Sequence, residues 1–136
     1  MHNLDQYLKV VQSHKPDAWA AAAALSSAID TQGYDEMIII ANAGTVEATT
    51  TVNIKATECA ASGGSYTDVS GAAFTEITAA NDVAVYVGRI DLSKRLRYFK
   101  ISMTLANDVG DMAVTVLLAR HILPPVSQTA TLAFRV

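Results

Sequence analysis

The feature that most constrains this chain is a two-residue alternation of apolar and polar side chains in RLRYFKISMTLAND, residues 95–108. Every second residue from Phe99 to Leu105 is apolar, and the residues between them are polar. Successive side chains of a β-strand point to opposite faces, so this pattern puts all the apolar groups on one face. The stretch is therefore predicted to be a half-buried strand, which needs a second apolar layer to cover it.

The same signal recurs from residue 29 onward, and turn residues such as Asn, Asp, Gly and Pro separate the segments. The expected strands are MIIIANAG (37–44), ATTTVNIKATE (48–58), a short segment at 66–69, DVAVYVGRIDL (82–92), RYFKISMTL (97–105), MAVTVLLARHIL (112–123) and QTATLAFRV (128–136). Turn signals recur roughly every 8–12 residues, which is typical of a β-sandwich. Since no helical crossover separates the strands, the sequence predicts an all-β fold with antiparallel sheets.

The inward phase of the alternating strands also predicts the core. The residues expected between the two sheets are Ile39, Val52, Ile54, Val85, Ile101, Met103, Val114 and Val116.

The first part of the chain has weaker signals. We expect residues 1–28 to form an N-terminal arm and residues 29–136 to form the sandwich domain. The first 16 residues permit one short helix or an extended arm, because HKP disfavours helix immediately before Pro16. DAWAAAAALSSAID, residues 17–30, consists largely of good helix formers but lacks a polar face, so helix and extended strand both remain open.

Composition excludes several classes of function. Hydrophobic residues make up 51% of the chain, charged residues make up 17%, and the net charge is -3, so the chain is predicted to fold and not to bind nucleic acid. A single cysteine permits no intramolecular disulfide and favours a reducing compartment. The N-terminus has no signal-peptide pattern and the apolar runs are too short to span a bilayer, so no membrane association is expected.

No group of residues indicates catalysis. His2, His14 and His121 lie far apart and have no metal-ligand spacing. A nucleophilic pair of Cys59 with His121 would need a third group to orient it. The loop ASGGSYTD lacks the lysine and the helix of a phosphate-binding loop. We therefore predict no catalytic residue, no metal and no cofactor, and hence no enzyme.

The basic cluster KRLRYFK, residues 94–100, permits two interpretations: a solvated strand edge, or a docking element for an acidic partner surface. The terminal segments carry apolar residues that a minimal sandwich need not bury, and residues 128–136 alternate like a strand that could pair with an open sheet edge. The candidate interface residues are Leu8, Val11, Trp19, Arg95, Arg97, Leu132 and Phe134.

Three short motifs resemble a known family: IDTQGY at Ile29–Tyr34, GSYTDV at Gly64–Val69 and RYFK at Arg97–Lys100. They resemble the small jelly-roll cement, or decoration, proteins of tailed bacteriophages, over about Ala28–Pro125. This resemblance implies a jelly-roll sandwich and a structural protein of the virion, made in the host cytoplasm. It also implies a homo-oligomer, a dimer or a trimer, that binds the outer surface of the major capsid protein shell and stabilises it.

The alternative is a carbohydrate-binding β-sandwich module of a phage fibre or enzyme. Such a module needs an exposed aromatic platform, and the candidate rings are those of Tyr66, Tyr86 and Tyr98.

Overall fold

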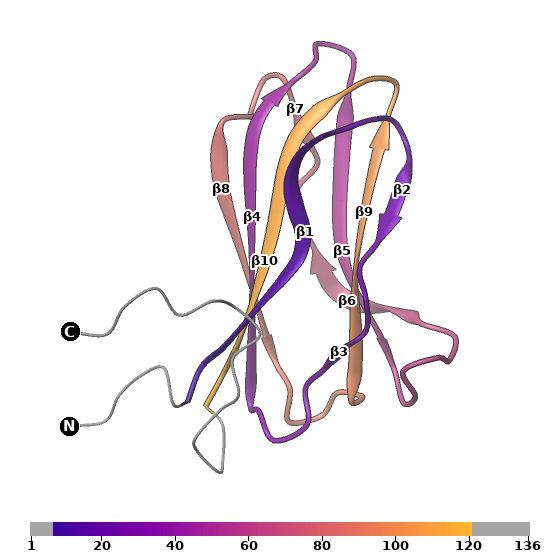
Figure 1. Cartoon of the computed structure of the whole chain (residues 1–136), viewed down its shortest axis with the longest axis vertical. Helices are drawn as coiled ribbons and strands as arrows, with labels where there is room; N and C mark the ends of the chain where they lie inside the picture. The colour runs from indigo at the N-terminus through magenta and orange to yellow at the C-terminus, as the bar shows by residue number, and fades with distance from the viewer. Residues whose placement is uncertain (1–6, 121–136) are drawn as a thin grey trace, which may run out of the picture.

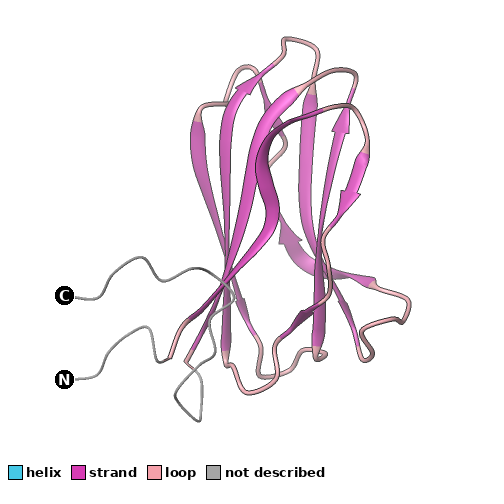
Figure 2. Ribbon diagram, viewed as in Figure 1, coloured by secondary structure: helices cyan, strands magenta, loops and turns pink. Residues whose placement is uncertain are grey.

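The computed structural model describes residues 7–120, which form ten β-strands in two antiparallel sheets packed face to face (Figures 1 and 2). The four-stranded sheet has the order β1 (Lys9–Trp19), β10 (Gly110–Ala119), β4 (Glu36–Val46) and β8 (Ala84–Asp91). The second sheet has the order β2 (Ala23–Leu25), β9 (Tyr98–Ala106), β5 (Thr51–Cys59) and β6 (Thr67–Ala73), with β3 (Ile29–Asp30) on β9 and β7 (Ile77–Thr78) on β5. The predicted all-β antiparallel sandwich is thus confirmed.

The core lies between the inner faces of the two sheets, where the alternating apolar side chains meet. Phe99 and Met37 are among the largest of the fully buried side chains. Seven of the eight predicted core residues are at most 2% exposed: Ile39, Val52, Ile54, Ile101, Met103, Val114 and Val116. The strand phase was therefore predicted correctly for β4, β5, β9 and β10.

The prediction for Val85 is wrong, because this side chain is 60% exposed on the outer side of β8. The opposite phase of β8 faces inward, with Tyr86 packed against the core and Ile90 buried. Gly88 belongs to the same inward phase, and a Cβ atom there would lie only 3.0 Å from the Phe74 ring. The ring of Phe74 thus occupies the space that a side chain at position 88 would need.

The helix alternatives for the N-terminal segment are also wrong. Residues 9–19 form β1, which pairs with β10, and residues 23–25 form β2, which pairs with β9. The extended chain satisfies its backbone groups against these two long strands, which outweighs the helix propensity of the alanines. Part of the expected arm therefore contributes one strand to each sheet. Among residues 7–120, no helix is long and apolar enough to cross a membrane.

Candidate protein-binding surface

The outer face of the four-stranded sheet carries an uncharged band that crosses all four strands. Its position follows from the alternation: Val114, Val116 and Ile39 are buried, so their strand neighbours point outward. We call this band the apolar face; its members are Val10 and Gln12 on β1, Ala113, Thr115 and Leu117 on β10, Ile38, Ile40 and Asn42 on β4, and Val85 and Val87 on β8. Strand pairing makes the band continuous, since Thr115 lies opposite Ile40 and Ile40 lies opposite Val87.

The most exposed part of the apolar face is at β8. Val85 is 60% exposed and Val87 is 64% exposed, and Val83, just before the strand, is 73% exposed. Exposed valines side by side with partly exposed isoleucines of β4 form a contiguous patch. Patches of this kind mark binding surfaces on soluble proteins, whereas single exposed apolar residues do not.

Among the described residues, the charged groups that border the apolar face lie at its two ends. At one end Arg89 forms an ion pair with Glu36. At the other end Lys15 lies 2.6 Å from Asp17, near the exposed Asp111. An uncharged centre with a charged rim is the arrangement of residues found in protein interfaces.

The backbone at Val83 is strained. Its φ is 52°, a left-handed conformation that β-branched residues rarely adopt. The Val83 N–H donates to the Gly44 carbonyl at 3.1 Å, and the Asp82 carboxylate accepts from the Val46 N–H at 2.8 Å. These two bonds hold an apolar side chain in solvent at a cost of about 1–3 kcal/mol. Strain of this size concentrates at functional sites, which supports a role for the β8 end of the apolar face.

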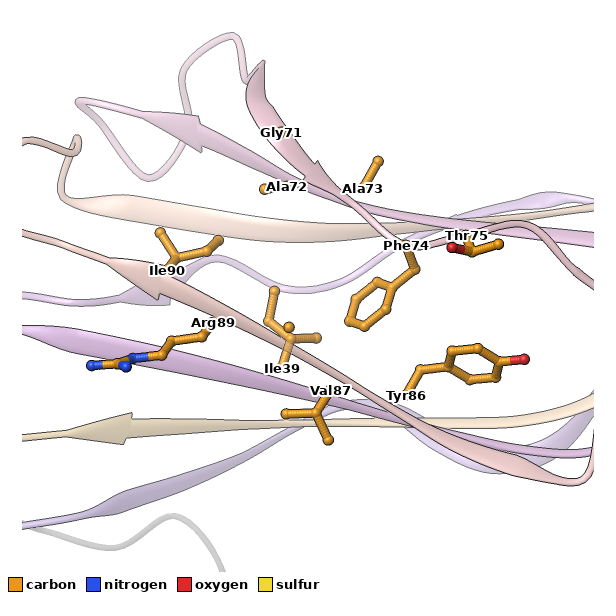
Figure 3. Close-up of a pocket in the computed structure, with 11 residues that line it drawn as sticks. Ile39, Gly71, Ala72, Ala73, Phe74, Thr75, Tyr86, Val87, Arg89 and Ile90 are labelled. Carbon is orange, nitrogen blue, oxygen red and sulfur yellow. The ribbon is translucent and has the colours of Figure 1, made fainter.

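A pocket of about 290 Å³ opens beside β8, between this strand and residues 71–75 (Figure 3). The ring of Phe74 extends from the other sheet towards β8, and Ile39 and Ile90 also line the pocket. β8 ends the four-stranded sheet and β6 ends the order of the second sheet, so the pocket lies where two sheet edges face each other.

The two arginines predicted at the interface are paired within the domain. Arg97 donates to both carboxylate oxygens of Asp30, at 2.9 and 2.7 Å, and these hydrogen bonds lower the pKa of Asp30. Arg95 lies 3.3 Å from Glu58, whose other oxygen accepts from the Leu96 N–H. Acidic groups of the same chain thus partly neutralise this region, which is consistent with the solvated-edge interpretation.

Two other predicted interface residues pack inside the sandwich. Val11 points towards the core. The Trp19 ring lies edge-on to His14, with centroids 5.5 Å apart, and its N–H donates to the carbonyls of Lys15 and Met112.

The remaining interface predictions lie at or beyond the ends of the described chain. Leu8 is partly exposed just before β1. Leu132, Phe134 and His121 lie outside the described residues, so their roles stay predictions.

The tyrosines considered for carbohydrate binding are engaged within the domain. The Lys100 ammonium lies 4.7 Å from the centroid of the Tyr66 ring, and the Arg97 guanidinium lies 4.9 Å from that of Tyr98. The Tyr86 hydroxyl donates to a backbone carbonyl, and its ring packs against the core. Each of these three tyrosines thus already contacts another group of the domain.

Within residues 7–120, no group of three or more His, Cys, Asp or Glu side chains is placed to hold a metal ion. Cys59 is buried, and a Cβ atom at Gly64 would lie only 2.6 Å from its sulfur. The glycine loop therefore packs over the thiol.

The apolar face was not predicted from the sequence, although a signal for it was present. MIII at 37–40 and VLLA at 116–119 are apolar at consecutive positions, so both faces of these strands had to be apolar. A continuous apolar run is compatible with burial on both sides, and it was interpreted in that way for β4.

The comparisons with known proteins assign no family: no protein-family model matches the chain, and no curated protein matches its sequence. The motifs, the strand order and the apolar face therefore supply the evidence for function.

Proposed function

We propose that this chain is a bacteriophage capsid decoration protein of jelly-roll type, which binds the outer surface of the major capsid protein shell as a homo-oligomer and stabilises it. The apolar face is the observation that carries this proposal. A sandwich with an uncharged, partly strained outer face is suited to binding by surface burial.

The strand order supports the jelly-roll type. If β2 and β3 count as one interrupted strand, and β6 and β7 as another, the chain has eight strands. The first then pairs with the eighth, the second with the seventh, the third with the sixth and the fourth with the fifth. A jelly roll has eight strands in two Greek keys, and wrapping a long antiparallel hairpin into two sheets produces this order.

In this proposal the protein stabilises the shell by burying surface at a noncovalent interface. A stable interface buries on the order of 1,000 Å² or more, and one face of a four-stranded sheet can contribute much of that area. Icosahedral repetition then adds multivalency, because an oligomer bound at several sites dissociates only when all contacts open. Ligands that bind only the intact shell stabilise it by mass action against opening.

The test is titration of the purified protein onto capsid shells of the encoding phage from which the decoration protein has been removed. The proposal expects saturable binding and a higher temperature of shell opening. Val85→Asp with Val87→Asp places two charges on the apolar face and should abolish binding. The matched control is Ala23→Asp with Leu25→Asp, which adds the same charges with the same spacing to β2 on the other sheet.

Melting curves first establish that both variants fold. The proposal is wrong if the parent protein leaves the shells unbound, or if the β8 variant binds them as tightly as the β2 variant does.

A further inference from the structure

We propose that β8 is an acceptor edge for a strand from a second copy of this chain. The donor strand is residues 128–136, and its apolar side chains enter the pocket between β8 and β6. This inference does not depend on the capsid proposal.

Among the described residues, β8 is an edge strand with an uncharged central part. Residues Ala84–Gly88 carry no charge and no proline, and the charged residues Arg89 and Asp91 lie only at the end of the strand. The other edges carry the usual protection: β1 has Pro16, Lys15 and two register shifts, β2 has three residues, and β6 has a register shift and Gly71 at a φ of 79°. Long, uncharged edges promote pairing with another chain, so proteins keep them only where a partner covers them.

The pocket beside β8 could accept side chains of an added strand. A strand added to β8 points alternate side chains to the inner side of the sheet, which is the side on which the pocket opens. Ile39, Ala72, Phe74 and Ile90 give this pocket apolar walls. Among the described residues no strand pairs with the outer edge of β8, and a strand that binds there would fit the pocket if its inward phase is apolar.

The sequence of the proposed donor has the alternation that such a strand needs. QTATLAFRV has Ala130, Leu132, Phe134 and Val136 in one phase and mostly polar residues in the other. Nine donor residues match the eight residues of β8. In this mode of recognition the backbone hydrogen bonds provide affinity and the side-chain pockets provide specificity.

The path of the chain favours a second copy as the source of the strand. Both β10 and β8 are antiparallel to β4, so they run in the same direction. Their last residues, Ala119 and Asp91, both lie beside Glu36, so the two strands end at the same end of the sheet. To pair antiparallel with its own β8, the chain would have to reverse and cross three strand spacings, about 14 Å, within residues 121–127. Two prolines in that stretch, Pro124 and Pro125, restrict φ and disfavour such a reversal, so we expect a second copy to supply the strand. Reciprocal exchange closes a dimer, and head-to-tail exchange closes a ring.

The first experiment measures the self-association of the full-length protein by native mass and sedimentation. Leu132→Asp and Phe134→Asp put a charge into the pocket phase and should weaken self-association on the order of 30-fold or more. The matched control is Thr131→Asp, which adds the same charge to the same strand in the opposite phase and should retain the parent's mass.

The second experiment identifies the donor chain, in a Cys59→Ser background. One protein carries Val85→Cys or Val87→Cys and another carries Ala133→Cys; after mixing under oxidising conditions, a disulfide between the two chains is expected. Three results would each overturn the inference. The parent protein could be monomeric, its oligomer could keep its mass in the Leu132→Asp and Phe134→Asp variants, or the disulfide could form only when both cysteines are on one chain. Because none of these experiments uses capsid shells, their failure is distinguishable from a failure of the proposed function.

Discussion

The outer faces of the two sheets differ, although both sheets bury similar inner faces. On the six-stranded sheet, Lys55 lies 2.7 Å from Asp68, and the Asn53 amide donates to a carboxylate oxygen of Glu76 at 3.0 Å. On the four-stranded sheet, the central positions of the outer face carry valine, isoleucine, leucine and uncharged polar groups. A sandwich selected only for solubility would protect both faces with charge. This difference supports the proposal that the apolar face is used for binding, whereas the outer face of the six-stranded sheet stays in water.

The largest effect is expected in the core that the two faces share. Ile101→Ala removes a fully buried side chain from β9 and should lower the free energy of unfolding by about 2–5 kcal/mol. Thr104 lies on the outward side of the same strand and is exposed, so Thr104→Ala should change stability by no more than about 0.5 kcal/mol. Denaturant melting measures both variants, and equal losses would contradict the assignment of the inner and outer faces of β9.

Two buried threonines extend the comparison to hydrogen bonding. Thr50 is 1% exposed and its hydroxyl has no partner among the described residues, whereas the Thr57 hydroxyl donates to the Lys100 carbonyl at 3.0 Å. Thr50→Val should therefore stabilise the fold by about 1 kcal/mol, and Thr57→Val should destabilise it by about as much. Thermal melting in parallel is the measurement, and a loss of stability in both variants would show that Thr50 has a partner.

Val83→Gly separates stability from binding on the apolar face. Glycine tolerates the left-handed backbone, so relief of strain should outweigh the added freedom of the unfolded chain and raise stability by about 1 kcal/mol or less. The same change removes an exposed apolar group and should weaken binding to shells. Asn107→Gly is the control at a second left-handed position (φ 77°), where loss of the side-chain bond to Thr49 should lower stability.

The pH dependence tests His14, a buried residue of β1 whose ring contacts β2 of the other sheet. Its Nε2–H donates to the Ala24 carbonyl at 3.2 Å and its Nδ1 accepts from Ser13, so the neutral ring is satisfied. Burial lowers the pKa of His14, so below about pH 6.5 the unfolded chain binds a proton that the folded chain excludes. Stability should thus be complete above pH 6.5 and should fall as the pH drops towards the folded-state pKa. Melting of His14→Gln across this range should remove that component, and an unchanged pH profile would contradict the assignment.

An element could be predicted from the sequence when the pattern that defines it lies within its own residues. β9 was expected at 97–105 and lies at 98–106, and β8 was expected at 82–92 and lies at 84–91. Alternation within one strand defines these elements without reference to any other part of the chain. For the N-terminal segment the local signal was ambiguous, and pairing with β10 and β9 decided the outcome.

The candidate site was harder to predict than the fold. The phase of β8 depended on the ring of Phe74 filling the space at Gly88, a contact between different sheets. The arginines of the basic cluster were visible in the sequence, but their acidic partners were not, since Arg97 and Asp30 are 67 residues apart.

The sequence by itself determined that the chain is an all-β sandwich, because period-two alternation and turn residues act within a few residues of each other. It also determined that several strands have an apolar side. In β4, β5, β9 and β10 it determined which residues point inward. Only the tertiary structure decided which side of β8 faces the core, which charges are paired and where the uncharged residues of four strands meet. These properties depend on contacts between segments far apart in the chain, and strand order and register alone bring such segments together.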